Sequence, residues 1–153
     1  MDKHFPHIFV LHVSKGYDDR ARHIDAMMKR LGLDYEYILE GDLDDIDSDI
    51  MARYFHPDGE LSPARGATSC SYKHLLACRR IIDRGMPGAV VLEDDIVLGD
   101  RFEEIVMRSI GQLPDGDPAI INYEDTRLRF VPRSKRRRGQ VIYPGDRDRF
   151  TGA

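Results

Sequence analysis

The sequence predicts an α/β fold in which a parallel sheet is flanked by helices. Short apolar runs rich in β-branched residues recur at 7–13, 35–39, 89–92 and 119–123. Segments with apolar residues at helical spacing lie between them. The first strand, helix and strand follow one another within about 35 residues, which is typical of a βαβ unit with parallel strands.

The composition is that of an ordinary globular protein. A chain of 153 residues, 41% apolar and 33% charged, is long enough for one domain with a real core, so we expect a single domain over 1–153. The net charge of −4 argues against a nucleic-acid partner. No apolar run reaches membrane-spanning length, and residues 1–6 lack the apolar core of a signal peptide.

The two cysteines, Cys70 and Cys78, are eight positions apart in a helical pattern. This distance is too long for a disulfide within one helix. We expect both thiols to be reduced and the compartment to be the cytoplasm. Neither cysteine belongs to a recognisable metal-binding motif.

The first predicted strand, 7–13, is nearly all apolar, as expected of a strand that is covered on both faces. In the helix that follows, Asp18 or Asp19 is a candidate N-cap and Gly32 marks the end. Its apolar positions recur at helical spacing: Ile24, Met27, Met28 and Leu31. The second strand is 35–39.

Residues 41–58 are acidic, but they lack the central glycine and terminal glutamate of an EF-hand loop. A solvated loop with a short helix through Ile46, Ile50 and Tyr54 is favoured over a calcium site.

The longest predicted helix begins at Ser62-Pro63 and ends near Arg84, before Gly85. Its expected apolar face consists of Leu75, Cys78, Ile81 and Ile82. His74 lies on the same helix, and a hydrogen-bonded structural role is favoured there over a catalytic one.

Glu93, Asp94 and Asp95 directly follow the predicted strand at 89–92. Ligands of open α/β sheets bind at the carboxyl ends of the strands. Three adjacent carboxylates repel one another, and a cation that prefers oxygen ligands, Mg²⁺ or Mn²⁺, would stabilise them. If the chain stays extended, alternation places Glu93 and Asp95 on one face and Asp94 on the other. The alternative is a solvated acidic turn.

Beyond this cluster the pattern predicts a helix with Phe102, Ile105, Val106 and Ile110 inward. A fourth strand at 119–123 ends in Glu124 and Asp125. Residues 130–131 and 140–143 suggest a hairpin whose tip is basic at 135–138, and solvation of this tip is favoured over phosphate binding.

Three blocks of the sequence occur in a particular order. Asp19-Arg20 follows an N-terminal strand, Cys70 and His74 lie on the central helix, and Leu-Glu-Asp-Asp follows at 92–95. In this order they resemble glycosyltransferase family 25, the lipooligosaccharide biosynthesis and collagen galactosyltransferase family, with its Gly-Cys-x-x-Ser-His and Leu-Glu-Asp-Asp segments. The resemblance spans about 7–104 and covers the N-terminal part of the family's usual length, so we expect a truncated form, a short natural form or a degenerate copy of the family's domain. This chain has His12-Val13, Ser69 and Lys73 where the family usually has Asn-Leu, Gly and Ser.

The resemblance implies a Rossmann-like sheet of the GT-A type and transfer of a hexose, most simply galactose, from a UDP-sugar. The acceptor would be a saccharide or glycolipid of lipooligosaccharide or another glycan, and the enzyme would be cytoplasmic, with at most peripheral contact at the inner face of the membrane. Asp95 would be the principal ligand of Mn²⁺ or Mg²⁺, with Glu93 as the second. The donor-binding residues would be His12, Val13, Asp19, Arg20, Glu93 and Asp94. Glu124 and Asp125 are candidate catalytic bases from their position alone.

Arg20 suits either a donor phosphate or a neighbouring carboxylate. Two other functions remain open. A family-like domain without activity would bind only a sugar nucleotide or a partner. A receiver-like regulatory module also has an acidic pair after a buried strand, but its acids follow the first strand rather than a late one.

Overall fold

The computed structural model describes residues 4–55, 66–114, 119–123, 134 and 136–143. Backbone contacts divide the chain into two compact units, one over Pro6–Leu98 and one that combines Met1–Phe5 with Gly99–Ala153. The elements of the first unit are β1 (His7–Leu11), α1 (Asp18–Leu31), β2 (Glu36–Ile38), the 3₁₀ turn η1 (Leu43–Asp45), α2 (Ser48–Tyr54), α3 (Gly66–Asp83) and β3 (Ala89–Glu93). The expected single domain over 1–153 stays a prediction.

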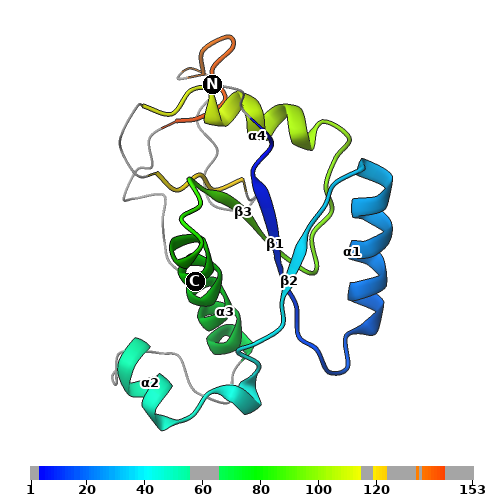
Figure 1. Ribbon diagram of the computed structural model, residues 1–153. Helices are drawn as coiled ribbons and strands as arrows, with labels where there is room; N and C mark the ends of the chain where they lie inside the picture. The colour runs from blue at the N-terminus through cyan, green and yellow to red at the C-terminus, as the bar shows by residue number, and fades with distance from the viewer. Residues whose placement is uncertain (1–3, 56–65, 115–118, 124–133, 135, 144–153) are drawn as a thin grey trace. The chain divides into compact units, whose positions relative to one another are not determined.

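The sheet confirms the predicted α/β class and its parallel strands. Its order is β2-β1-β3, and both neighbours run parallel to β1 (Figure 1). The register pairs Leu11 with Ile38 on one side and with Glu93 on the other. All three strands therefore end at the same edge of the sheet, and the segments that follow them meet there.

Helix α3 packs against all three strands on one face of the sheet. Phe9 and Leu11 of β1 are buried there with Ala77 of α3. By strand alternation, Ile8 and Val10 point to the other face, and both are buried. Tyr37 belongs to that face, because its hydroxyl donates to the carbonyl of Ala21 in α1. Helices therefore cover both faces, as the apolar first strand predicted.

Helix α1 begins and ends for different reasons. Its N-cap is Tyr17, so the prediction that Asp18 or Asp19 caps the helix is wrong. Both acids lie in the first turn, where the helix dipole favours negative charge. Gly32 ends the helix in the left-handed conformation with φ 67°, as predicted.

The buried face of α3 differs from the predicted one. Leu75, Cys78 and Ile82 are exposed, whereas the buried positions are Thr68, Ser69, Lys73 and Ala77. The helix buries polar side chains because the polar segment after β2 lies against it. Ser69 donates to the carbonyl of Gly41, and Lys73 donates to the carbonyls of Leu39 and Glu40.

The second unit contains α4 (Phe102–Ile110), where a helix was predicted. Phe102 packs edge-on against Phe5, with ring centroids 6.0 Å apart. The fourth strand predicted at 119–123 is wrong, because these residues form no strand and the side chain of Ile120 is fully exposed. Residues 140–143 likewise form no strand, and 130–131 lie outside the described residues.

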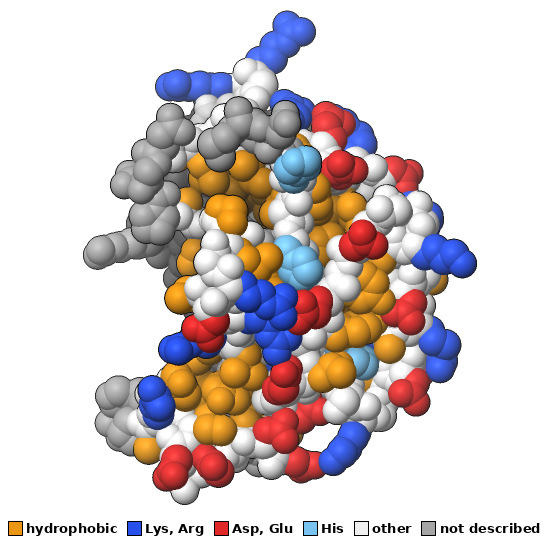
Figure 2. Space-filling model, in the orientation of Figure 1, with side chains coloured by type: hydrophobic (Ala, Val, Ile, Leu, Met, Phe, Trp, Pro, Cys, Tyr) orange, Lys and Arg blue, Asp and Glu red, His pale blue; other side chains and the backbone are white. Residues whose placement is uncertain are grey.

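Charged side chains of both signs lie against one another on the face shown in Figure 2. Glu36 at the start of β2 illustrates such pairing, since it accepts hydrogen bonds from Arg80 at 2.8 Å and from Arg84 at 2.7 Å. No helix in the described part of the chain has both the length and the apolar character needed to cross a bilayer.

Candidate functional site

The carboxyl edge of the sheet gathers three segments that are distant in sequence. His12 follows β1, Leu39 follows β2, and Asp94 follows β3. Because ligands of α/β sheets bind at this edge, it is where a functional site is expected.

Asp94 lies at the centre of this edge and is buried. One carboxylate oxygen lies 2.7 Å from Nδ1 of His12, and the other accepts a 2.8 Å hydrogen bond from Arg20 of α1. Burial by itself would raise the pKa of Asp94, but the hydrogen bonds from Arg20 and His12 outweigh it and lower that pKa below its usual range. Three predicted donor-binding residues thus meet here, and Asp94, with a partner on each carboxylate oxygen, holds the loop after β1, helix α1 and the end of β3 together.

The geometry assumed for the other two acids is wrong. Strand β3 ends at Glu93 and the chain turns at Asp94 and Asp95, so alternation does not extend to Asp95. The Asp95 carboxylate lies 3.4 Å from the same Arg20 that pairs with Asp94. Glu93 instead points to α3, where it contacts His74. The acidic cluster is therefore divided between the two helices that flank the sheet.

A group of three different ligand types surrounds Glu93. The Sγ atom of Cys70, a ring nitrogen of His74 and a carboxylate oxygen of Glu93 all lie within 4.8 Å of one another. The contact with His74 lowers the pKa of Glu93. Burial, reinforced by the charge of Glu93, raises the pKa of the Cys70 thiol to about 11.

This cluster was not predicted from the sequence, because neither cysteine belongs to a recognisable metal-binding motif. Cys70 and Cys78 are both free, as predicted. The sequence does contain one indication of the cluster. Cys70 and His74 are four positions apart on a predicted helix, so their side chains lie on the same face.

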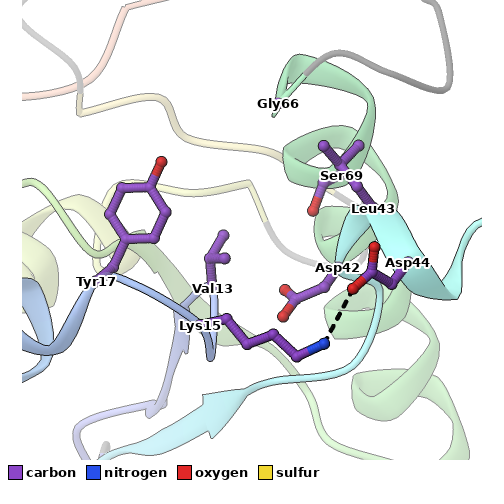
Figure 3. Close-up of a pocket in the computed structure, with 8 residues that line it drawn as sticks. All are labelled: Val13, Lys15, Tyr17, Asp42, Leu43, Asp44, Gly66 and Ser69. Carbon is purple, nitrogen blue, oxygen red and sulfur yellow. Dashed lines mark hydrogen bonds and ion pairs between the residues drawn. The ribbon is translucent and has the colours of Figure 1, made fainter.

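A small pocket of about 190 Å³ lies beside the first two strand ends (Figure 3). The loop after β1 contributes Val13, Lys15 and Tyr17, and the segment after β2 contributes Asp42, Leu43 and Asp44. Gly66 and Ser69 of α3 complete the lining. Lys15 donates a 3.0 Å hydrogen bond to Asp44 across the opening, as the dashed line in Figure 3 shows.

Asp42 anchors the pocket. Its Oδ2 atom accepts hydrogen bonds from both the backbone and the hydroxyl of Ser14, and its Oδ1 atom lies 2.7 Å from the ammonium of Lys73. Burial by itself would raise the pKa of Asp42, but the ion pair between the Lys73 ammonium and Oδ1 lowers that pKa, together with the hydrogen bonds from Ser14. Lys73 is 1% exposed. Its contacts with Leu39, Glu40 and Asp42 hold the segment after β2 against α3.

Two further acids of the segment after β2, Asp45 and Asp47, serve local structure. Asp45 accepts hydrogen bonds from the backbone of Gly41 and Asp42, and Asp47 caps α2 through the backbone N–H groups of Asp49 and Ile50. Helix α2 confirms the short helix predicted in this segment.

The other predicted site residues have different positions. Val13 lines the pocket. The side chain of Asp19 is 92% exposed and pairs with Arg22 at 3.3 Å, away from Asp94. Glu124 and Asp125 lie outside the described residues, as does Lys135 of the predicted basic tip.

Comparison with protein families gives one match that covers most of the chain. The model described as "Glycosyltransferase family 25 (LPS biosynthesis protein)" matches residues 5–146. No curated protein matches the chain. The matched region contains β1, the pocket, the Cys70 cluster and the acidic turn.

Proposed function

The chain belongs to glycosyltransferase family 25, and on this premise we propose that it transfers a hexose, most simply galactose, from a UDP-sugar to a saccharide acceptor. The acceptor would be a growing lipooligosaccharide or a related glycan. The reaction would take place in the cytoplasm, with peripheral contact at the inner face of the membrane where the acceptor is a glycolipid. The family match favours a glycosyltransferase over the receiver-like regulatory module, whose acidic pair would follow the first strand.

The observation that carries this proposal is the pocket at the ends of β1 and β2. Nucleotides bind α/β sheets at this edge. The ring of Tyr17, which is 43% exposed, offers a stacking surface for the uracil base. The carboxylate of Asp44, whose side chain is 78% exposed, offers an acceptor for ribose hydroxyls, a recurrent way of holding a ribose.

The diphosphate would extend from this pocket toward the acidic turn. Val13 lines the pocket, and its neighbour His12 contacts Asp94, so the pocket and the turn are joined along the chain. Arg20 would contribute a positive charge to the diphosphate. Its guanidinium lies at the acidic turn, where it contacts Asp94 and Asp95. A bound divalent cation would offset the charge that develops on the departing nucleoside diphosphate.

For that cation, the proposal from the sequence is Mn²⁺ or Mg²⁺ on Glu93 and Asp95 in a GT-A type site. The side chains of these acids are 51% and 55% exposed, so both are accessible from solvent. To join Glu93, however, Asp95 would have to leave Arg20. Glu124 or Asp125 would remove the proton from the acceptor hydroxyl.

A domain that binds a sugar nucleotide without transferring its sugar is the second candidate. The observation that favours it is the pairing of both Asp94 and Asp95 with Arg20, which leaves Glu93 as the acid of this turn without an arginine partner among the described residues. Transfer assays on a purified acceptor glycan separate the two candidates.

The experiment for the donor site is calorimetric titration of UDP-galactose and UDP-glucose with and without Mn²⁺. Tyr17→Ala should weaken binding roughly tenfold, as expected for a lost base-stacking platform. Tyr54→Ala is the matched control, because Tyr54 is similarly exposed but does not line the pocket. The proposal fails if the parent chain binds no UDP-sugar, or if the two variants bind it equally well.

A further inference from the structure

Three side chains that carry unlike metal-binding atoms meet at the end of β3. Cys70 and His74 come from adjacent turns of α3, and Glu93 is the last residue of the strand. The Sγ atom, one imidazole nitrogen and one carboxylate oxygen of these residues lie within 4.8 Å of one another. This group is the one set of three such residues in the described part of the chain that is close enough to hold a metal ion.

The spacing of His74 and Glu93 is close to that of two ligands on one metal ion. Nε2 of His74 lies 3.4 Å from Oε1 of Glu93, which is long for a hydrogen bond. Two ligands at tetrahedral Zn²⁺, each bonded at about 2.0 Å, are separated by about 3.3 Å. A bound ion therefore requires little movement of either side chain.

The types of ligand select the ion. A thiolate and an imidazole favour Zn²⁺ over Mg²⁺ or Mn²⁺, which prefer oxygen. Three protein ligands leave the fourth tetrahedral position open, as in catalytic zinc sites. The side chains of His74 and Glu93 are about half exposed, so an ion can enter from solvent.

An alternative use of the same residues is a cysteine nucleophile activated by histidine. Such a nucleophile needs a lowered thiol pKa, whereas burial and Glu93 raise the pKa of Cys70. Coordination has no such requirement, because the ion itself displaces the proton.

We propose that Cys70, His74 and Glu93 form a Zn²⁺ site at the carboxyl end of β3, with the fourth coordination position open to water or to a phosphate oxygen. On binding, the sulfur–zinc bond replaces the S–H bond and the proton is released to solvent. This site shares Glu93 with the Mn²⁺ or Mg²⁺ site proposed from the sequence, but it replaces Asp95 by ligands from α3. The zinc site does not depend on the proposed sugar transfer, and metal binding to it can be measured without any sugar donor.

The test is titration of the full chain with Co²⁺, which reports its ligands by absorption, followed by displacement with Zn²⁺. The parent should develop thiolate-to-cobalt charge-transfer absorption together with the visible bands of a tetrahedral site. Cys70→Ser should abolish the charge-transfer absorption. Cys78→Ser is the matched control, because Cys78 lies on the same helix but outside the cluster, and it should behave like the parent.

Two further variants sharpen the result. Loss of an outer-shell partner alone weakens metal binding ten- to hundredfold, so His74→Gln should weaken Co²⁺ binding by more than about a hundredfold. Asp95→Asn should leave the spectrum unchanged. Circular dichroism of each variant confirms that the chain is folded.

The inference is overturned if the parent shows no thiolate-to-cobalt absorption, or if that absorption persists in Cys70→Ser. It is also overturned if Asp95→Asn removes the spectrum while His74→Gln retains it. A positive cobalt spectrum in a chain that binds no UDP-sugar would support the metal site and reject the donor site, so the two proposals fail independently.

Discussion

Nδ1 of His12 lies 2.7 Å from Oδ2 of Asp94, and both side chains are buried at the carboxyl edge of the sheet. An ionised carboxylate only accepts hydrogen bonds, so Nδ1 carries the proton and donates it. This contact joins the end of β1 to the end of β3. Together with Arg20, it makes Asp94 the structural centre of the site rather than a free metal ligand.

The first prediction is that Asp94→Asn lowers the free energy of unfolding by about 2 kcal/mol at pH 7, the range for hydrogen bonds to a charged group. The folded-state pKa of Asp94 is lowered, so its stabilisation is complete above the unfolded value of 3.8 and is lost as the pH falls through the folded value. The gap between parent and variant should therefore close in acid. Urea denaturation at pH 7 and below pH 3.8 measures it, and a gap that widens in acid would contradict this account.

The second prediction concerns Asp95→Asn. The Asp95 carboxylate is 55% exposed, and its ion pair with Arg20 should contribute less than about 1 kcal/mol to stability. If Asp95 holds Mn²⁺ or Mg²⁺, the variant should lose the metal dependence of UDP-sugar binding while remaining folded. Calorimetry checks this, with Asp83→Asn at the end of α3 as the control. Unchanged metal dependence in both variants would remove Asp95 from the donor site.

The third prediction concerns Lys73, whose ammonium is surrounded by three oxygens. It donates to the carbonyls of Leu39 at 2.8 Å and Glu40 at 3.0 Å and pairs with Asp42 at 2.7 Å. Lys73→Met leaves Asp42 without its cation and should lower the free energy of unfolding by about 3–5 kcal/mol, measured by chemical denaturation. Lys29→Met, at an exposed position of α1, should change it by no more than about 0.5 kcal/mol. Similar losses in both variants would mean that burial of Lys73 does not matter.

The fourth prediction is a pH dependence at Glu36. Hydrogen bonds from Arg84 and Arg80 lower the pKa of Glu36 from 4.5 to about 2. A carboxylate with a lowered folded-state pKa stabilises the fold above its unfolded pKa and loses this effect as the pH falls through the folded value. Glu36→Gln should therefore be less stable than the parent at pH 7, and the difference should vanish near pH 2. Thermal melts across this range provide the measurement, and a constant difference would point to packing instead of charge.

The sequence predicted the sheet well because its signal is local. β1, β2 and β3 are short apolar runs, and a strand, helix and strand in close succession favour parallel pairing. The run at 119–123 has the same local signal but forms no strand. A strand forms only where it pairs with a neighbour, and the amino-acid pattern of one segment does not reveal whether it does so.

The place of the site in the fold was predictable from the sequence, but which of its side chains contact one another was not. The acids at the end of β3 and the first-strand loop do lie at one edge, as expected from strand polarity. That Arg20 pairs with both Asp94 and Asp95 depends on a turn after Glu93, which alternation does not predict. Lys73 was missed for another reason: a charged helical residue is normally at the surface, and only the carbonyls of 39–40 explain its burial.

The central strand has partners at very different distances along the chain. Phe9 pairs with Glu36, 27 positions later, whereas the His12–Asp94 contact beside β3 spans 82 positions. Closing the longer loop costs about 1 kcal/mol more in chain entropy, and distant contacts form more slowly. We expect β1, α1 and β2 to assemble first and β3 to dock last, which pulsed hydrogen exchange during refolding would detect as later protection of 89–93. The site residues on β1 and α1 would then wait for Asp94, so a refolding intermediate would have a sheet but no site.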